Sequence, residues 1–474
     1  MGRKPPIPTE LWEQVPATAQ AALLVVLKQY EEHIARLEER IRGLEEHVGK
    51  NSTNSSRPPS SDAPAVKRAP PKDASGRARG GQPGHALHAR PLLPPDRCIP
   101  LKPTTCRRCG RALHGDDPEP RRHQVIDLPE PKPDVTEYQL HRLACPCCGT
   151  TTCAPLPAGV PTGQSGPCLQ ATTALLTGAY RLSKRQAEAL LGDLFGVPLS
   201  AGEVCALEQQ TAAVLAPVVE ELQHFCRTQP ANVDETGWRQ ERRRAWLWVV
   251  VTNLASVFHI ALSRGATVVH ELLGEAYRQV LTTDRWSAYN GQPLRYRQLC
   301  WAHLQRDFQA MVDRGNAGSA IGEELLCCAE DLFTWWYRVR DGTLSRATFR
   351  NYMGTVRTMT REALEAGRVC GCAKTSATCA ELLKMEAALW TFVRVEGIEP
   401  TNNAAERAVR HVVQWRKTSY GTDSQAGSQF VARILSVVAT CRQQGRHVLG
   451  YLTQCCQAAL HGVPAPSLLP QPSS

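Results

Sequence analysis

The amino-acid sequence predicts a multidomain α+β protein. Its 474 residues are enough for two to four domains, each with its own core. An apolar repeat near the N-terminus is typical of a long helix, and residues 231–300 carry strand patterns that helical patterns precede and follow. The 34 Pro and 34 Gly gather in particular stretches and indicate linkers between folded parts.

Composition restricts the class of protein and its partners. The formal net charge of +10 makes a polyanion a natural partner, although a modest positive charge is also common in proteins that never bind nucleic acid. The 19 cysteines lack the even spacing of a small secreted scaffold, and the N-terminal residues lack the apolar core of a signal peptide. Polar residues interrupt the apolar stretch 245–262, which favours two buried strands over a membrane span. We expect a soluble protein of a reducing cytoplasm, with no membrane contact.

Residues 1–50 are predicted to contain a helix with coiled-coil heptads. Apolar side chains recur there in alternating steps of four and three, at Leu23, Leu27, Tyr30, Ile34, Leu37, Ile41, Leu44 and Val48. This pattern predicts self-pairing and therefore a homo-oligomer. The alternative is an amphipathic helix packed on its own chain, which the narrow stripe and its charged flanks disfavour. The register and the number of strands stay open.

Residues 51–97 are predicted to form a basic, flexible linker rich in Pro, Ser and Gly. Apolar periodicity is almost absent, and residues 57–97 hold eight Lys or Arg against three Asp. Arg77 and Arg79 lie in a Gly-rich segment that can follow phosphates or enter a narrow minor groove. A solvated linker whose charge only keeps it soluble is an equal alternative.

Residues 98–155 are predicted to form a zinc-binding module. Two Cys-x-x-Cys pairs flank a segment whose parts 124–128 and 135–142 look like the strands of a hairpin, and four thiolates brought together in this way suit a closed structural Zn²⁺ site. Cys147 is an alternative to Cys145 or Cys148 as a ligand, and unligated buried cysteines are the other interpretation. The expected ligands are Cys106, Cys109, Cys145 and Cys148.

Residues 156–230 are helical in pattern. A helix over 183–195, a Gly-containing turn and a second helix from Ala201 have the outline of a helix-turn-helix. The second helix carries Glu203, Glu208, Gln209 and Gln210, so it is acidic rather than basic. This favours a packing role over DNA reading for the region, although both stay open.

Residues 231–300 are predicted to form the first part of a catalytic domain. Strands are expected around Asp234, over 245–251, over 256–262 and over 279–283, with a helix at 265–273 before the last strand, which ends at Asp284. This is the order of an RNase H-like α/β sheet, in which the first and fourth strands are neighbours. Asp234 and Asp284 can therefore approach each other, whereas Glu235 is expected on the opposite face of its strand from Asp234.

Phosphodiester chemistry with two metal ions needs a further carboxylate, because hard oxygen ligands suit Mg²⁺ or Mn²⁺. Glu406 lies at the start of a predicted helix whose stripe of Ala405, Ala408, Val409 and Val412 packs on the sheet. Asn403 and Glu406 also fit a capping box, and Glu235, Glu399 and Asp423 are competing acids. Four basic residues follow Glu406 and are expected to hold DNA phosphates: Arg407, Arg410, Arg416 and Lys417.

Glu406 follows Asp284 by 122 positions, which is more than such a sheet needs, so we expect a helical insertion over 301–395. The second part of the catalytic domain is then 396–463, and 464–474 is expected to be a disordered tail. His303 is a candidate DNA contact, with a helix-end histidine satisfied by its own surroundings as the alternative.

These motifs, in this order, resemble the insertion sequence 66 family of bacterial DDE transposases over nearly the whole chain. The carrying segments are residues 51–62 and 80–85, the two Cys-x-x-Cys pairs, residues 234–237 and 284–289, Cys300-x-x-His303 and residues 402–407. The resemblance implies Asp234, Asp284 and Glu406 as the catalytic triad. It also implies binding of the element's terminal inverted repeats and small accessory proteins of the same element.

The function expected from the sequence is that of a DNA transposase in a bacterial cytoplasm, associated with the nucleoid. Water activated by the metal pair would cleave the element ends, and the freed 3′-hydroxyl ends would then join target DNA. The alternative is a non-catalytic or decayed DNA-binding regulator built from the coiled coil and the zinc module. An RNase H-like nuclease without strand transfer is a third possibility.

Overall fold

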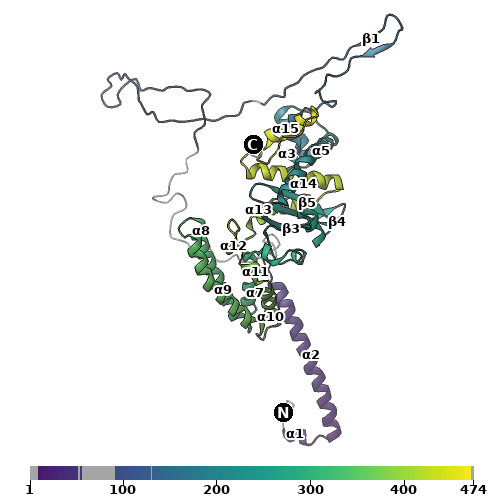
Figure 1. Cartoon of the computed structure of the whole chain (residues 1–474), viewed down its shortest axis with the longest axis vertical. Helices are drawn as coiled ribbons and strands as arrows, with labels where there is room; N and C mark the ends of the chain where they lie inside the picture. The colour runs from purple at the N-terminus through teal and green to yellow at the C-terminus, as the bar shows by residue number, and fades with distance from the viewer. Residues whose placement is uncertain (1–8, 52–53, 56–90, 130, 471–474) are drawn as a thin grey trace.

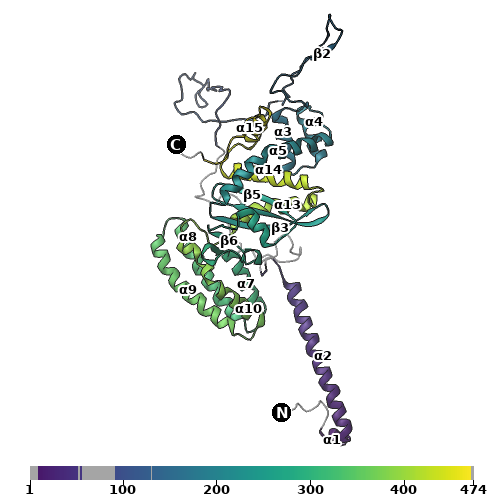
Figure 2. The same ribbon diagram turned by 45° about the vertical axis from the view of Figure 1, so that its right-hand side comes forward.

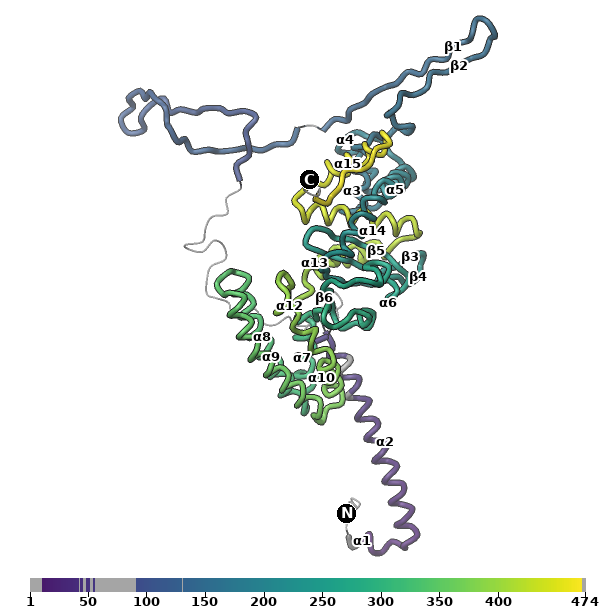
Figure 3. The backbone as a smooth tube through the Cα atoms, in the orientation of Figure 1, coloured from purple at the N-terminus to yellow at the C-terminus, as the bar shows by residue number. Residues whose placement is uncertain are grey.

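The computed structural model describes residues 9–51, 54–55, 91–129 and 131–470 (Figure 1). Most of the basic linker, with Arg77 and Arg79, lies outside the described residues. A central sheet with helices on both faces joins a second group of helices, while helix α2 and a small hairpin extend from opposite ends of the molecule (Figures 1 and 3).

The N-terminal part is helical, as predicted. Helix α1 (Thr9–Glu13) precedes helix α2 (Ala17–Gly49), which contains the whole apolar repeat. Nearly all of these apolar side chains are exposed in the single chain, with Tyr30 64% and Val48 84% accessible. The helix therefore does not bury its stripe on its own chain, and the predicted pairing with a second copy stays a prediction.

The strands predicted between the two cysteine pairs are wrong. Strand β1 (Arg142–Ala144) pairs antiparallel with β2 (Thr151–Cys153), and the two enclose the second Cys-x-x-Cys turn. A bridge between Thr105 and Ala112 encloses the first in the same way. Each turn therefore closes its own short hairpin, because the residues that flank it pair with each other, and segment 124–128 forms no strand.

Three helices follow, and they match the predicted helix-turn-helix outline. Helix α3 (Pro167–Gly178) leads to α4 (Lys184–Phe195), and Gly196, with a φ of 66°, ends α4 before α5 (Ala201–Cys226). Glu208 on α5 is 6% exposed and forms an ion pair with Lys184 of α4. This face of α5 is therefore used for packing.

The central sheet contains five strands in the order β5-β4-β3-β6-β7. Strands β3 (Ala231–Gln240), β4 (Arg243–Val251) and β5 (Ser256–Ala261) are antiparallel, whereas β6 (Leu281–Thr283) and β7 (Arg297–Leu299) run parallel to β3. Helix α6 (Ala266–Leu273) and the 3₁₀ helices η2 (Ser287–Tyr289) and η3 (Leu294–Tyr296) lie in the connections. The predicted pairing of the first and fourth strands is confirmed.

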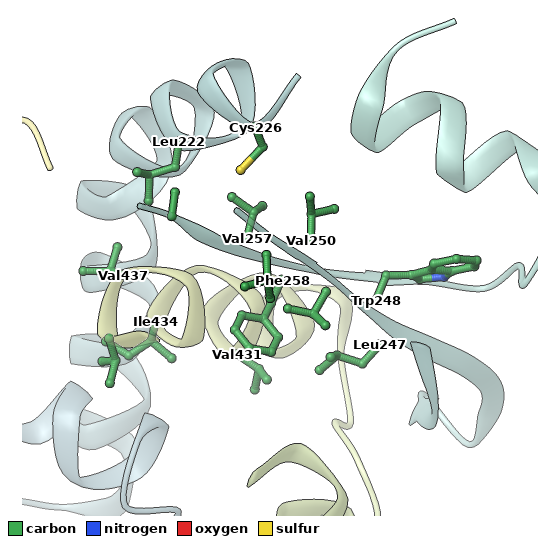
Figure 4. Packing of buried hydrophobic residues seen from close by; sticks show 14 of the residues in the cluster. Leu222, Cys226, Leu247, Trp248, Val250, Val257, Phe258, Val431, Ile434 and Val437 are labelled. Carbon is green, nitrogen blue, oxygen red and sulfur yellow. The ribbon is translucent and has the colours of Figure 1, made fainter. Parts of the chain in front are cut away.

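Helices cover both faces of this sheet. Figure 4 shows Val250 and Val257 on the side of Cys226 in α5, and Leu247 and Phe258 on the side of α14 (Gln425–Gln443). Helix α13 (Asn403–Ser419) packs on the same face as α14, and α15 (Val448–Leu460) packs against α3 and α5. The alternation of side chains along each strand thus places apolar residues on both faces of the sheet, and they belong to one continuous hydrophobic core.

Part of the predicted disordered tail is ordered. Leu468 is fully buried, the Tyr451 hydroxyl donates to the Pro466 carbonyl over 2.6 Å, and the Ser467 hydroxyl donates to Glu221 over 2.7 Å. Residues 464–470 therefore pack on the helices, because the apolar side chain of Leu468 completes their core. Residues 471–474 lie outside the described part.

Six helices between β7 and α13 surround a second hydrophobic core (Figure 2). They are α7 (Trp301–Asp313), α8 (Ser319–Arg340), α9 (Arg346–Arg368), α10 (Ala373–Lys384), α11 (Glu386–Leu389) and α12 (Thr391–Arg394). Aromatic rings fill this core, for example Trp336 edge-on to Phe392 with ring centroids 5.5 Å apart. Among the described helices, none is long and apolar enough to cross a membrane.

Candidate active site

Two aspartates lie on neighbouring strands of the sheet. Asp234 is inside β3, which continues to Gln240, whereas Asp284 directly follows the end of β6. Strands β3 and β6 pair in register, with Asn232 opposite Thr282. Continuing this register by two residues places Asp234 level with Asp284, and both side chains then leave the same face of the sheet. The Asp284 carboxylate accepts the backbone N–H of Trp286 over 2.8 Å, which orients it at the start of the following turn.

The beginning of α13 is attached to β3 by Asn402. This side chain is 1% exposed, donates to the Val233 carbonyl over 2.8 Å and accepts from the Asn232 side chain over 3.0 Å. Its backbone N–H donates to the Cys300 sulfur over 3.1 Å. The start of α13 is therefore held against the first residues of β3, and Glu406 follows one turn further on.

The predicted capping box at this helix is wrong. The N-cap residue is Asn402 rather than Asn403, and no side-chain hydrogen bond caps the helix. The physical reason is that the amide of Asn402 serves the strand instead of its own helix, while Asn403 is exposed. Glu406 lies in the first turn and is free of a capping role.

Glu406 faces two basic side chains of α7. One of its oxygens lies 3.4 Å from Nδ1 of His303, and the other lies 3.6 Å from the Arg306 guanidinium. His303 Nδ1 and Glu406 Oε1 are both buried without a hydrogen-bond partner. Burial lowers the pKa of His303, and the charge of Glu406 opposes that shift. His303 therefore faces Glu406, and the His303 side chain is only 14% exposed.

The acids share one electrostatic environment. Burial raises the pKa of Asp234 well above its ordinary value, and the negative charges of Glu235, Asp284 and Glu406 raise it further. Neighbouring carboxylates oppose each other's ionisation, and bound cations reduce the repulsion between their negative charges. Oxygen donors of this kind, with the unpartnered Oε1 of Glu406 among them, fit Mg²⁺ or Mn²⁺.

Of the competing acids, Glu235 has a defined role in the fold. It accepts from Arg264 over 2.8 Å and from the Tyr289 hydroxyl over 2.5 Å. Tyr289 in turn lies edge-on to Trp248, the strand partner of Glu235. These contacts are on the face away from α13, as predicted, and they hold the turn after Asp284. Glu399 and Asp423 are both exposed.

Residues that sequence reasoning missed fix the turn after Asp284. The Arg264 guanidinium lies 3.9 Å from the centre of the Trp286 ring, whose indole N–H donates to the Arg264 carbonyl over 3.1 Å. Arg285 donates to Asp307 of α7 over 2.8 Å and to Glu381 of α10 over 2.6 Å. Arg285 and Trp286 had a signal in the sequence, because they belong to the Asp284 to Tyr289 motif, whereas Arg264 lies outside that motif and had none.

The predicted phosphate-binding residues on α13 divide into two groups. Arg407, Arg410 and Lys417 are exposed. Arg416 instead donates to the Gly237 carbonyl over 2.8 Å and to the Thr236 hydroxyl over 3.2 Å, so it ties α13 to β3. The expected phosphate contact of Arg416 is therefore replaced by a structural one.

Three further basic residues, absent from the sequence prediction, lie beside Arg410 on the exposed part of α13: Arg181, His411 and Arg442. Arg181 donates to the Gln414 side chain over 3.0 Å. Burial lowers the pKa of His411, and the charges of Arg442, Arg181 and Arg410 lower it further. Side chains from three separate segments thus form one patch, made of Arg181, Arg410, His411 and Arg442, in which the three arginines carry the positive charge.

The two cysteine pairs form separate turns of the same design. In each turn the backbone N–H of the glycine after the second cysteine donates to the backbone carbonyl of the first cysteine. These bonds run from Gly110 to Cys106 and from Gly149 to Cys145, both over 2.9 Å. Contacts with Thr150 lower the pKa of the Cys148 thiol to about 7, which favours the thiolate that metals bind. In the described part of the chain the four sulfurs do not gather in one group, and the metal-ligand group that is present is Cys300, His303 and Glu406, with ligand atoms within 4.8 Å of one another.

Comparison with known proteins finds family models that match two parts of the chain besides a family of unknown function. A model of a zinc-finger binding domain of the IS66 transposase matches residues 103–149, which include both cysteine pairs and support a structural zinc ion. A family of unknown function matches residues 6–91.

A relative, the uncharacterized protein y4qI of Sinorhizobium fredii (strain NBRC 101917 / NGR234), is 28% identical over 245 residues. The match covers 47% of this chain and 45% of that relative, so it spans less than half of the relative's length. The model of the IS66 transposase family matches residues 163–430, more than half of the chain, from α3 through the sheet to the start of α14. The protein therefore belongs to the IS66 family of transposases.

Proposed function

We propose that the chain is a DDE transposase that cleaves the ends of a bacterial insertion element and joins the 3′-hydroxyl ends to target DNA. The observation that carries this proposal is the attachment of α13 to β3 through Asn402, which supports a position of Glu406 near Asp234 and Asp284. Three carboxylates, from β3, from the residue after β6 and from α13, would converge there, although they are far apart in sequence.

The order of the sheet supports an RNase H-like catalytic fold. Three antiparallel strands, a helix and a further strand parallel to the first are present in β3 to β6, and β7 extends the sheet at that edge. Helices α7 to α12 are proposed to be an insertion, since they have their own core and lie between β7 and α13. This arrangement explains the long interval between the second and third acids.

Asp234, Asp284 and Glu406 would hold two Mg²⁺ or Mn²⁺ ions between them. Such ions supply an activated water or hydroxyl and stabilise the leaving oxygen of a phosphodiester. The protein's part is to fix the acids in position: Trp286 N–H orients Asp284, and Asn402 fixes the helix of Glu406. Glu235, tied to Arg264 and Tyr289, supports the strand and the turn that carry the two aspartates.

DNA is proposed to follow the basic surface beside these acids. Arg407 and Arg410 are exposed on α13, and the patch of Arg181, Arg410, His411 and Arg442 continues from them. Phosphates favour such clusters because they replace counterions and neutralise the repulsion between the guanidinium groups. The zinc module and the basic linker with Arg77 and Arg79 are proposed as further contacts with the terminal inverted repeats.

Two transposase copies are proposed to pair through α2. The long exposed apolar stripe of this helix supports pairing, because leaving it in water is unfavourable. Two copies would also present two active sites to the two ends of one element. Small accessory proteins of the same element stay a proposal that rests on family resemblance.

The test is strand cleavage of a labelled duplex that carries a terminal inverted repeat. We expect Asp234→Asn, Asp284→Asn and Glu406→Gln each to abolish Mg²⁺-dependent cleavage while leaving binding of the duplex unchanged. Glu399→Gln, which changes an exposed acid close to α13, is the matched control and should cleave normally. Cleavage that survives one of the three substitutions would remove that residue from the triad, and cleavage that resists chelation would refute the metal mechanism.

A further inference from the structure

Cys300, His303 and Glu406 form a second arrangement of metal ligands beside the proposed catalytic acids. Their sulfur, nitrogen and oxygen ligand atoms lie within 4.8 Å of one another. Cys300 is the residue before α7, His303 is in the first turn of α7, and Glu406 is in the first turn of α13. The Trp301 N–H donates to the Pro400 carbonyl over 2.9 Å, so the starts of the two helices are held together.

Two of these ligand atoms lack partners. His303 Nδ1 and Glu406 Oε1 are 3.4 Å apart, and both are buried without a hydrogen bond. A buried polar atom without a partner is costly, so a pair of them facing each other needs an explanation. A cation bound between them would satisfy both, and the buried Cys300 sulfur is the third donor at the same place.

The donor types select the ion. Mg²⁺ binds oxygen and rarely thiolate, whereas a set of one sulfur, one imidazole and one carboxylate suits Zn²⁺ or Co²⁺. Three protein ligands leave the fourth tetrahedral position open. Arg306 lies 3.6 Å from the other Glu406 oxygen, and its positive charge opposes a bound cation. The negative charges of Asp284 and Asp307 act on His303 and favour a bound cation.

We propose that Cys300, His303 and Glu406 form a site for Zn²⁺ or an ion of similar softness, which overlaps the carboxylate that would hold Mg²⁺. On binding, the Cys300 thiol releases its proton to solvent, and the His303 and Glu406 side chains turn toward the ion. Because Glu406 cannot then serve the catalytic ions, the soft metal inhibits cleavage. This inhibitory effect rests on the proposed function, whereas metal binding itself does not.

Co²⁺ is the probe for binding, because a cobalt–thiolate bond absorbs in the near ultraviolet and cobalt bound only by carboxylates does not. Full-length protein with its zinc module loaded with Zn²⁺ is titrated with Co²⁺. We expect the sulfur band to grow in the wild type and in Cys328→Ser, which changes an equally buried cysteine in α8, and to be absent in Cys300→Ser. His303→Gln should weaken Co²⁺ binding on the order of tenfold or more, since one ligand is lost.

An equal sulfur band in the wild type and in Cys300→Ser would overturn the proposal. If Cys300→Ser does not fold, as judged by circular dichroism, unchanged Co²⁺ affinity in both His303→Gln and Glu406→Gln overturns it instead. The second measurement is cleavage in excess Mg²⁺ with added Zn²⁺, where we expect inhibition of the wild type and resistance of Cys300→Ser. If neither the wild type nor any variant cleaves in Mg²⁺ alone, the proposed function fails. The Co²⁺ titration then still shows whether Cys300, His303 and Glu406 bind a metal ion.

Discussion

Replacing Asn402 with Ala should both destabilise the protein and impair cleavage. The side chain donates to the Val233 carbonyl over 2.8 Å and accepts from Asn232 over 3.0 Å, at a position that is 1% exposed. A buried hydrogen bond contributes about 0.5–1.5 kcal/mol net, and a buried group left without its partner costs about 1–3 kcal/mol. Loss of both bonds is therefore expected to lower the free energy of unfolding by about 2–4 kcal/mol.

The effect on activity follows from the place of Asn402 between strand and helix. Without this attachment the start of α13 shifts relative to Asp234, and a displacement of about 1 Å at a catalytic group costs on the order of 100-fold in rate. Denaturant unfolding measures the loss of stability. Mg²⁺-dependent cleavage of an inverted-repeat duplex, under conditions in which the variant is still folded, measures the loss of activity.

Asn403→Ala is the matched control, because Asn403 is the exposed neighbour that the capping box would require. We expect it to change stability by less than about 0.5 kcal/mol, as is usual for exposed positions. If Asn403→Ala costs more than Asn402→Ala, the side chains act as a helix cap and the argument from the strand attachment is refuted. Asn402→Asp should be no better than Asn402→Ala, because it replaces the donor to the Val233 carbonyl with an acceptor.

Three more outcomes are expected. Cys106→Ser should remove about one zinc ion per chain, measured by metal analysis of purified protein; unchanged zinc content would contradict a site at the first cysteine pair. Burial and the neighbouring arginines lower the pKa of His411, and bound phosphates would oppose the effect of the arginines. DNA binding should therefore take up a proton and tighten as pH falls from about 8 to about 6, and His411→Gln should flatten this dependence in a binding titration. Arg416→Met should lower the free energy of unfolding by about 1–3 kcal/mol, whereas Arg407→Met should leave stability unchanged and weaken DNA binding; the reverse pattern would restore Arg416 as a phosphate contact.

Local patterns were sufficient for most of the elements. The heptad repeat predicted α2, the Gly-containing turn predicted the junction of α4 and α5, and β-branched runs predicted strands β4 and β5. These features are set by periodicity and backbone preference over a few residues, so they can be read without tertiary contacts. The prediction of strands around the cysteines failed because these short segments have no strong periodicity. The pairing of the strands there depends on the Cys-x-x-Cys turns instead.

The sequence by itself determined which acids are the candidates for the site, namely Asp234, Asp284 and Glu406. Only the tertiary structure decided what surrounds them. Whether Asn402 or Asn403 is the structural asparagine, whether Arg416 contacts solvent or β3, and whether His303 meets Glu406 all depend on packing between segments that are far apart in the chain. The physical reason is that a hydrogen bond or ion pair across such distances leaves no periodic trace in the sequence, since each partner is a single residue on a different element.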